Sequence, residues 1–151
     1  MTEREMRPPV ERWLLANGYT VRHERQVCGG YADLIGVRWH PRVGRLIPEI
    51  AEVIVVELKV RDVGGVLRQL AGAMCVAHRV WAAMPEPIVR SMRAGTLRRF
   101  REKGYGLLGV RENWVQIYVE ACKREERVIP DYIRRRMWRG PSWRELARRK
   151  L

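Results

Sequence analysis

The sequence predicts an α/β fold, a three-layer α/β/α sandwich with a central mixed β-sheet, over residues 1–122. Two observations support it. Segments with helical spacing of apolar residues alternate with short aliphatic runs of strand length. The run VIVVELKV, residues 53–60, is apolar enough for a strand covered on both faces, which places it at the centre of the sheet.

The first element is a helix. Thr2 and Glu5 have the spacing of a capping box, which starts the helix at Glu3. The proline pair at 8–9 is expected to kink or restart it, because proline does not fit a helix interior. Gly18 is a natural residue for the helix end.

Strands and further helices follow in the order β-β-β-α-β-α-β-β. The first three strands are expected over 19–27, 31–39 and about 50–60, with a turn at Gly29-Gly30 and a loop over 40–48. The remaining elements are expected as a helix from Asp62 to Ala77, a strand over 79–84, a basic helix over 87–102 and strands over 105–110 and 114–121. Residues 111–113 read as a hairpin turn between the last two strands. Of the six tryptophans, Trp13, Trp81 and Trp114 are expected in the core.

Charge is the strongest global signal. The 151 residues carry a net charge of +13, and residues 123–151 alone hold eleven basic and four acidic side chains. We interpret these residues as a basic C-terminal extension. A field of one sign points to a polyanionic partner, and nucleic acid is favoured over an anionic membrane surface.

Several classes of protein are disfavoured by composition. No apolar run approaches the length of a membrane span, and the first residues have no apolar core of a signal peptide. Cys28, Cys75 and Cys122 are odd in number and widely spaced, which predicts neither a disulfide framework nor a zinc site. We therefore expect a cytoplasmic protein.

Charged residues stand on the most apolar strands. Side chains alternate along a strand, so Glu57 and Lys59 share one face with Val53 and Val55. Glu57 and Lys59 either form a buried ion pair with a structural role, or they line a face that opens into a functional cleft. Asp33 is a second inward acid, on the preceding strand. Two carboxylates and the Leu58 carbonyl are hard oxygen ligands that suit Mg²⁺ or Mn²⁺.

In these residues the chain resembles the PD-(D/E)XK nuclease superfamily. The matching residues are Asp33 on one strand and Glu57-Leu58-Lys59 on the next, within a predicted αβββαβ core over about residues 3–84. The resemblance implies a restriction-endonuclease-like fold, carboxylates that bind Mg²⁺ or Mn²⁺, and a lysine that assists the attacking water. Ala32 departs from the family pattern, because many members have proline there.

The resemblance also suggests accessory residues. Many members carry a glutamine on the helix after the motif strand that points into the site, which here corresponds to Gln69. A glutamate on the first helix is also common, and Glu3 fits best. Glu5 is expected to serve the capping box, and Glu11 lies off the apolar stripe of the helix.

The basic extension has its own candidate residues. A short basic helix is expected over 142–150, beginning at Ser142. It either docks on the body or on a second subunit, or clamps backbone phosphates, and a homodimer stays open. The arginines proposed to contact nucleic acid are Arg134, Arg135, Arg136, Arg139, Arg144 and Arg148.

The sequence thus predicts a metal-dependent nuclease that acts on DNA in preference to RNA. A small domain without a separate recognition domain suits a structure-specific enzyme for repair or junction resolution. The alternative is a nucleic-acid-binding module that keeps the fold but does not cleave.

Overall fold

The computed structural model describes residues 1–27, 30–40 and 50–124. Its elements in chain order are α1 (Glu3–Ala16), β1 (Thr20–Val27), β2 (Gly30–Trp39), β3 (Ile50–Leu58), α2 (Val63–Ala73), β4 (Arg79–Pro85), α3 (Glu86–Arg90), α4 (Ala94–Lys103), β5 (Gly106–Val110) and β6 (Val115–Val119). The expected loop over 40–48 falls mostly outside the described residues, and so does the basic extension from residue 125 onward.

The described strands form one mixed sheet in the order β1-β2-β3-β4-β5-β6. The pairs β3–β4 and β4–β5 are parallel. The pairs β1–β2, β2–β3 and β5–β6 are antiparallel. The α/β class with a central mixed sheet is therefore confirmed. β3, which carries the run VIVVELKV, lies inside the sheet as expected.

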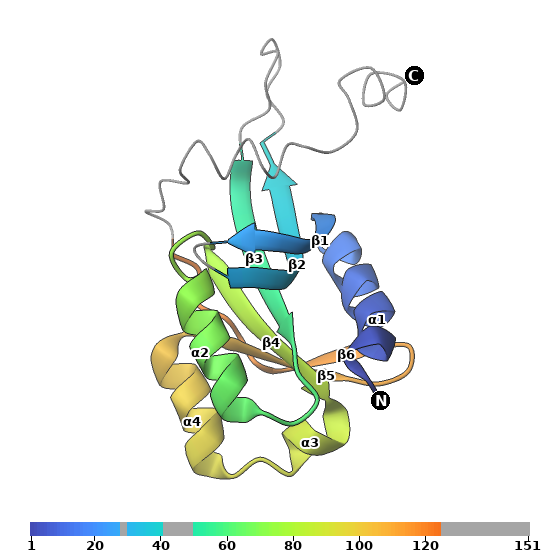
Figure 1. The fold of residues 1–151 in the computed structure, drawn as a ribbon, viewed down its shortest axis with the longest axis vertical. Helices are drawn as coiled ribbons and strands as arrows, with labels where there is room; N and C mark the ends of the chain where they lie inside the picture. Colours follow the sequence, from blue (N-terminus) through green and yellow to red (C-terminus); the bar gives the residue numbers. More distant parts are fainter. Residues whose placement is uncertain (28–29, 41–49, 125–151) are drawn as a thin grey trace.

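Helices cover both faces of this sheet, α1 on one side and α2 with α4 on the other (Figure 1). Met6, Val10 and Leu14 of α1 pack on the face formed by residues such as Ile54 and Val56. The core on the opposite face contains more residues. They come from β3, α2 and α4 among other elements and include Val53, Val55, Val66, Leu70 and Phe100. The alternation along β3 thus separates two apolar cores, which is what its sequence predicted.

The first helix differs from the expectation at its prolines. The capping box is confirmed, because Glu5 N–H donates to the Thr2 hydroxyl and the Glu5 carboxylate accepts from Thr2 N–H. However, α1 runs unbroken through Pro8 and Pro9. The prolines leave the carbonyls of Arg4 and Glu5 without helical partners, and both residues are exposed, so water can satisfy them.

Two further element boundaries were wrong. The helix expected over 87–102 is two helices, α3 and α4, separated where Arg93 adopts an extended backbone with φ −66° and ψ 149°. The Ser91 hydroxyl donates to the Ile88 carbonyl there, a local bond that competes with helix continuation. The helix from Asp62 ends at Ala73, before the expected Met74 and Ala77.

The cysteines also differ from the expectation. Cys75 is disulfide-bonded, a pairing that the odd and widely spaced cysteines did not predict. Cys122 is an exposed free thiol. Among the described helices, none is long and apolar enough to cross a membrane.

Candidate functional site

The register between β2 and β3 brings the two predicted acids together. Leu34 pairs with Val56, so the next opposed positions are Asp33 and Glu57. Opposed residues of an antiparallel pair share a face and have Cβ atoms about 5 Å apart. The regular ladder stops at Leu34, and the Leu58 N–H donates instead to Asp33 Oδ2 at 2.8 Å. The Asp33 carboxylate therefore takes the place of a backbone partner where the strands part.

Glu57 is buried beside this carboxylate. Its side chain is 2% exposed, and its Oε2 has no hydrogen-bond partner among the described residues. Burial raises the pKa of Glu57 to about 8, and the charge of Asp33 and a hydrogen bond with its carboxyl group add to the rise, against the opposing charge of Lys59. Burial and the neighbouring acid therefore favour the protonated form of Glu57 at neutral pH.

Lys59 lies directly after the end of β3. Its N–H donates to the Ala83 carbonyl at 3.0 Å, so the backbone follows the parallel pairing one residue beyond the strand. The Lys59 Nζ is 3.8 Å from Glu3 Oε1, at the start of α1. The ammonium group is thus near the first helix and partly exposed to solvent, and its charge opposes the rise in the pKa of Glu57.

The other predicted residues are placed as follows. Glu3 contacts Lys59 rather than the carboxyl pair, and Gln69 is exposed on α2 with no hydrogen bond to Asp33 or Glu57 in the described structure. Leu58 makes its contact with Asp33 through its amide, so the role of its carbonyl stays a prediction. The arginines at 134, 135, 136, 139, 144 and 148 lie outside the described residues.

Two other buried glutamates were missed by sequence reasoning. Glu52, also on β3, is 2% exposed and binds Arg38 and Arg79 at 3.0 and 2.7 Å. Burial alone raises the pKa of Glu52, but hydrogen bonds from Tyr19 and Arg79 and the nearby guanidinium charges outweigh it and lower the pKa. Counting the β2–β3 register from Leu34 and Val56 would have placed Arg38 opposite Glu52.

Glu86, at the start of α3, is the third buried glutamate. It accepts a hydrogen bond from the Tyr118 hydroxyl at 2.8 Å and pairs with Arg111 at 3.1 Å. Burial opposes its ionisation, yet these contacts lower its pKa. Glu52 and Glu86 are therefore compensated by arginines, whereas Glu57 faces another acid.

The carboxyl pair suits a hard divalent cation. Carboxylate oxygens are the donors that Mg²⁺ and Mn²⁺ prefer, and Mg²⁺ keeps several waters, so two protein ligands are enough. The Glu57 Oε2 without a partner is the atom that a cation would satisfy. Within the described residues, no group of three or more His, Cys, Asp or Glu side chains could hold a metal ion.

Comparisons with known proteins support the fold. No family model matches the chain, and no curated protein does. Among solved structures, the SPO1766 protein of unknown function from Silicibacter pomeroyi is similar, with a TM-score of 0.64 over 99% of this chain and 88% of that chain. The two sequences are 18% identical, so the likeness concerns the fold alone.

Proposed function

We propose that the chain is a metal-dependent nuclease whose active site contains Asp33, Glu57 and Lys59. The observation that carries the proposal is the burial of Glu57 beside a second acid, Asp33. In a chain with 26 arginines, the fold supplies guanidinium groups to the buried Glu52 and Glu86 but places a second carboxyl group beside Glu57. A buried carboxylate pair of this kind is expected where a cation binds.

The chain's own residues have separable tasks in this proposal. The Leu58 N–H fixes one oxygen of Asp33, which orients the carboxylate toward Glu57. Glu57 would hold the cation in its ionised form, because metal ligands must be deprotonated. When bound, Mg²⁺ or Mn²⁺ would polarise the phosphodiester and lower the pKa of a coordinated water. Lys59 would orient the attacking water or meet the charge that develops on the phosphate.

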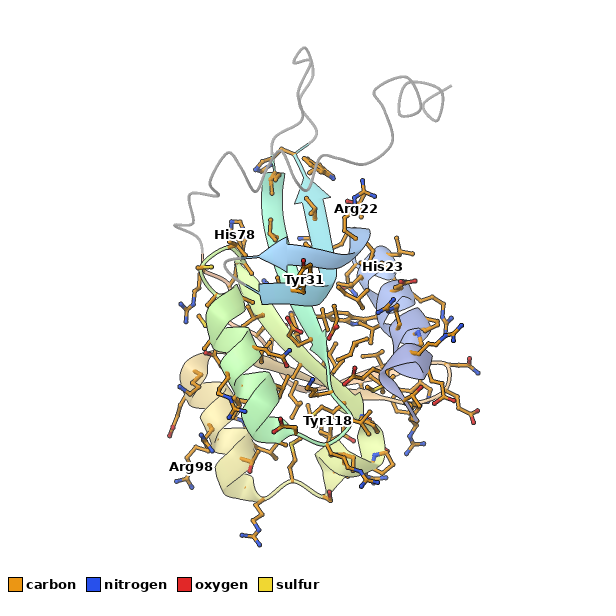
Figure 2. All side chains as sticks on the ribbon, viewed as in Figure 1. Arg22, His23, Tyr31, His78, Arg98 and Tyr118 are labelled. Carbon is orange, nitrogen blue, oxygen red and sulfur yellow. The ribbon has the colours of Figure 1, made fainter. Side chains whose placement is uncertain are left out.

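The wider features of the chain favour DNA as the substrate. The resemblance of Asp33 and Glu57-Leu58-Lys59 to the PD-(D/E)XK signature implies the restriction-endonuclease-like αβββαβ core, and the observed order α1-β1-β2-β3-α2-β4 agrees with that core. The net charge of +13 favours a polyanion. Exposed arginines on α4, including Arg98, which points away from the body in Figure 2, would contribute to phosphate binding.

Cleavage assays test the proposal directly. Single-stranded, duplex, flapped and four-way DNA are incubated with Mg²⁺, Mn²⁺ or EDTA, using the full chain, Asp33→Asn and the surface control Glu102→Gln. We expect metal-dependent cleavage that Asp33→Asn lowers more than about a hundredfold, because a metal ligand is lost. Glu102 is exposed on α4, so Glu102→Gln should cleave like the unmodified chain.

The alternative function, nucleic-acid binding without catalysis, predicts a different result in these assays. Tight DNA binding without cleavage in either metal would select the non-catalytic binding module, for which the exposed arginines of α4 are the supporting observation. Equal cleavage by Asp33→Asn and the unmodified chain would exclude this active site.

A further inference from the structure

A pocket of about 640 Å³ lies at the carboxyl ends of β4 and β5. Its lining includes Met1, Glu86, Arg111, Glu112, Asn113 and Trp114. Several of these residues form the turn between β5 and β6, where the Arg111 N–H donates to the Trp114 carbonyl at 2.9 Å. The pocket is thus framed by a hairpin turn, the start of α3 and the first residue of the chain.

One side of the pocket is joined by a network of side-chain contacts. Glu86, almost fully buried, binds the Tyr118 hydroxyl and the Arg111 guanidinium, and Figure 2 shows Tyr118 at the same lower end of the molecule as α3. Arg111 in turn lies over the Trp114 ring, with its Cζ 5.1 Å from the ring centroid. The indole is therefore held on one face by an anchored guanidinium, while 45% of Trp114 stays exposed.

This exposure corrects the sequence expectation that Trp114 belongs to the core. Alternation along 114–121 does not decide the matter, because Trp114 precedes β6 and belongs to the turn. Trp114 is therefore an exposed pocket-lining residue in contact with Arg111, and its ring is available to a ligand.

The pocket lies on the same edge of the sheet as the carboxyl pair. β3, β4 and β5 are parallel, so their carboxyl ends, with Leu58, Pro85 and Val110, reach the same edge. Met1 lines the pocket, and Glu3, two residues later, reaches Lys59. The start of α1 consequently links the pocket to the proposed active site.

The charge of the lining indicates the kind of ligand. The charges of this lining balance, because two carboxylates, Glu86 and Glu112, stand against the Arg111 guanidinium and the Met1 ammonium, and Glu86 is already paired with Arg111. Such a lining does not attract a phosphate, which basic surfaces bind. It suits a neutral, flat group with hydrogen-bonding edges, because Trp114 offers a ring face and Asn113 and Glu112 offer polar groups.

We propose that this pocket receives an unpaired nucleobase next to the phosphodiester that is cleaved. The inference rests on the proposed nuclease function and assigns its substrate class, which is single-stranded or flapped DNA rather than continuous duplex. An unpaired base stacks on Trp114 without the energy needed to open a base pair. Phosphates flanking that base would then extend toward Lys59.

Binding to short oligodeoxynucleotides that contain 2-aminopurine tests this inference. The fluorescence of 2-aminopurine is quenched when the base stacks, and EDTA prevents cleavage during the titration. The full chain is compared with Trp114→Ala, with Trp114→Phe, which keeps an aromatic face, and with Ile117→Ala. Ile117 is an exposed apolar residue of the same hairpin that does not line the pocket, so it is a matched control.

We expect Trp114→Ala to weaken binding of the single strand about tenfold, the loss typical of one stacked base. Duplex binding should change little, and Trp114→Phe and Ile117→Ala should retain both the affinity and the quenching. Unchanged single-strand affinity in Trp114→Ala would overturn the inference, and so would an equal loss for single strand and duplex.

The two proposals fail separately in these experiments. If the chain cleaves DNA but Trp114→Ala binds normally, the pocket assignment is wrong and the nuclease stands. If Trp114 governs single-strand binding but no metal supports cleavage, the pocket stands and hydrolysis does not.

Discussion

Replacing Glu57 by glutamine separates the cost of its burial from its use in binding a cation. Glutamine has nearly the same shape as a protonated glutamate and can donate a hydrogen bond to Asp33. At 2% exposure, Glu57 cannot ionise without leaving a poorly hydrated charge beside another acid. Glu57→Gln should therefore stabilise the metal-free fold wherever the unfolded chain would carry a charged glutamate.

The sign and size follow from the pKa. Folding raises the pKa of Glu57 from 4.5 to about 8, so between these values the folded protein holds a proton that the unfolded chain has lost. The stability of the unmodified chain falls across this window, and the advantage of Glu57→Gln grows by about 1.4 kcal/mol per pH unit. Above about pH 8 the difference levels off at roughly 5 kcal/mol, an upper value set by the full pKa change.

Urea unfolding in EDTA measures this difference. Curves for the full chain, Glu57→Gln and Glu102→Gln are recorded at about pH 5, 7 and 9, and the comparison between variants cancels the titration of other groups. Magnesium is then added at about pH 9. A cation at 100 times its dissociation constant should stabilise the full chain by about 2.7 kcal/mol and Glu57→Gln by much less.

Three results would refute this reasoning. A stability difference that stays flat from pH 5 to 9 would mean that Glu57 does not hold the buried proton. An equal gain from magnesium in both proteins would mean that the cation binds elsewhere. Destabilisation by Glu57→Gln at the highest pH would show that the carboxylate is stabilised by a partner.

Three further predictions concern other parts of the chain. Lys59→Ala should lower the single-turnover cleavage rate about a hundredfold and change DNA affinity less than about threefold, because the proposed contact of Lys59 matters in the transition state. Equal losses in rate and in binding would instead make Lys59 a phosphate anchor. Glu52→Gln should lower the free energy of unfolding by about 2 kcal/mol in urea titrations, because Arg79 and its companions lose a buried partner. The pKa of Glu52 is lowered by folding, so this stabilisation is present above its usual pKa and is lost as the pH falls through the lowered value; a loss that persisted at low pH would contradict the assignment. Deleting residues 134–151 should weaken binding to all DNA sequences alike and flatten the dependence of affinity on salt, whereas an unchanged slope with loss of solubility or of a dimer would select a packing role.

Much of the fold could be predicted from local patterns. The capping box at Thr2, the aliphatic run of β3 and the turn at 111–113 each depend on neighbouring residues, and each is confirmed. Strand alternation alone does not predict that Asp33 lies opposite Glu57. That position also depends on the register of the antiparallel pair. Here the two carboxylates lie on the same face, as the sequence suggested.

Other features depend on tertiary structure and left no local signal. Solvation of two exposed carbonyls, rather than any pattern in the sequence, lets α1 run through Pro8 and Pro9. Trp114 is an apolar residue at a strand start, so composition favoured the core, whereas its position in the turn exposes it. The sequence gives no local signal for Glu52, because its partners Arg38 and Arg79 are distant in the chain and reach it through the strand pairing.

The Glu52 network and the carboxyl pair mark the two ends of the same ladder. Regular pairing of β2 with β3 runs from Arg38 opposite Glu52 to Leu34 opposite Val56, and a bulge interrupts it just beyond Arg38. A slip of one residue would move every side chain to the other face of the sheet and separate Asp33 from Glu57. The ion pair at one end opposes such a slip, because Glu52 would then lose Arg38 and remain buried. The Glu52–Arg38 ion pair thus favours the strand register that places Asp33 opposite Glu57.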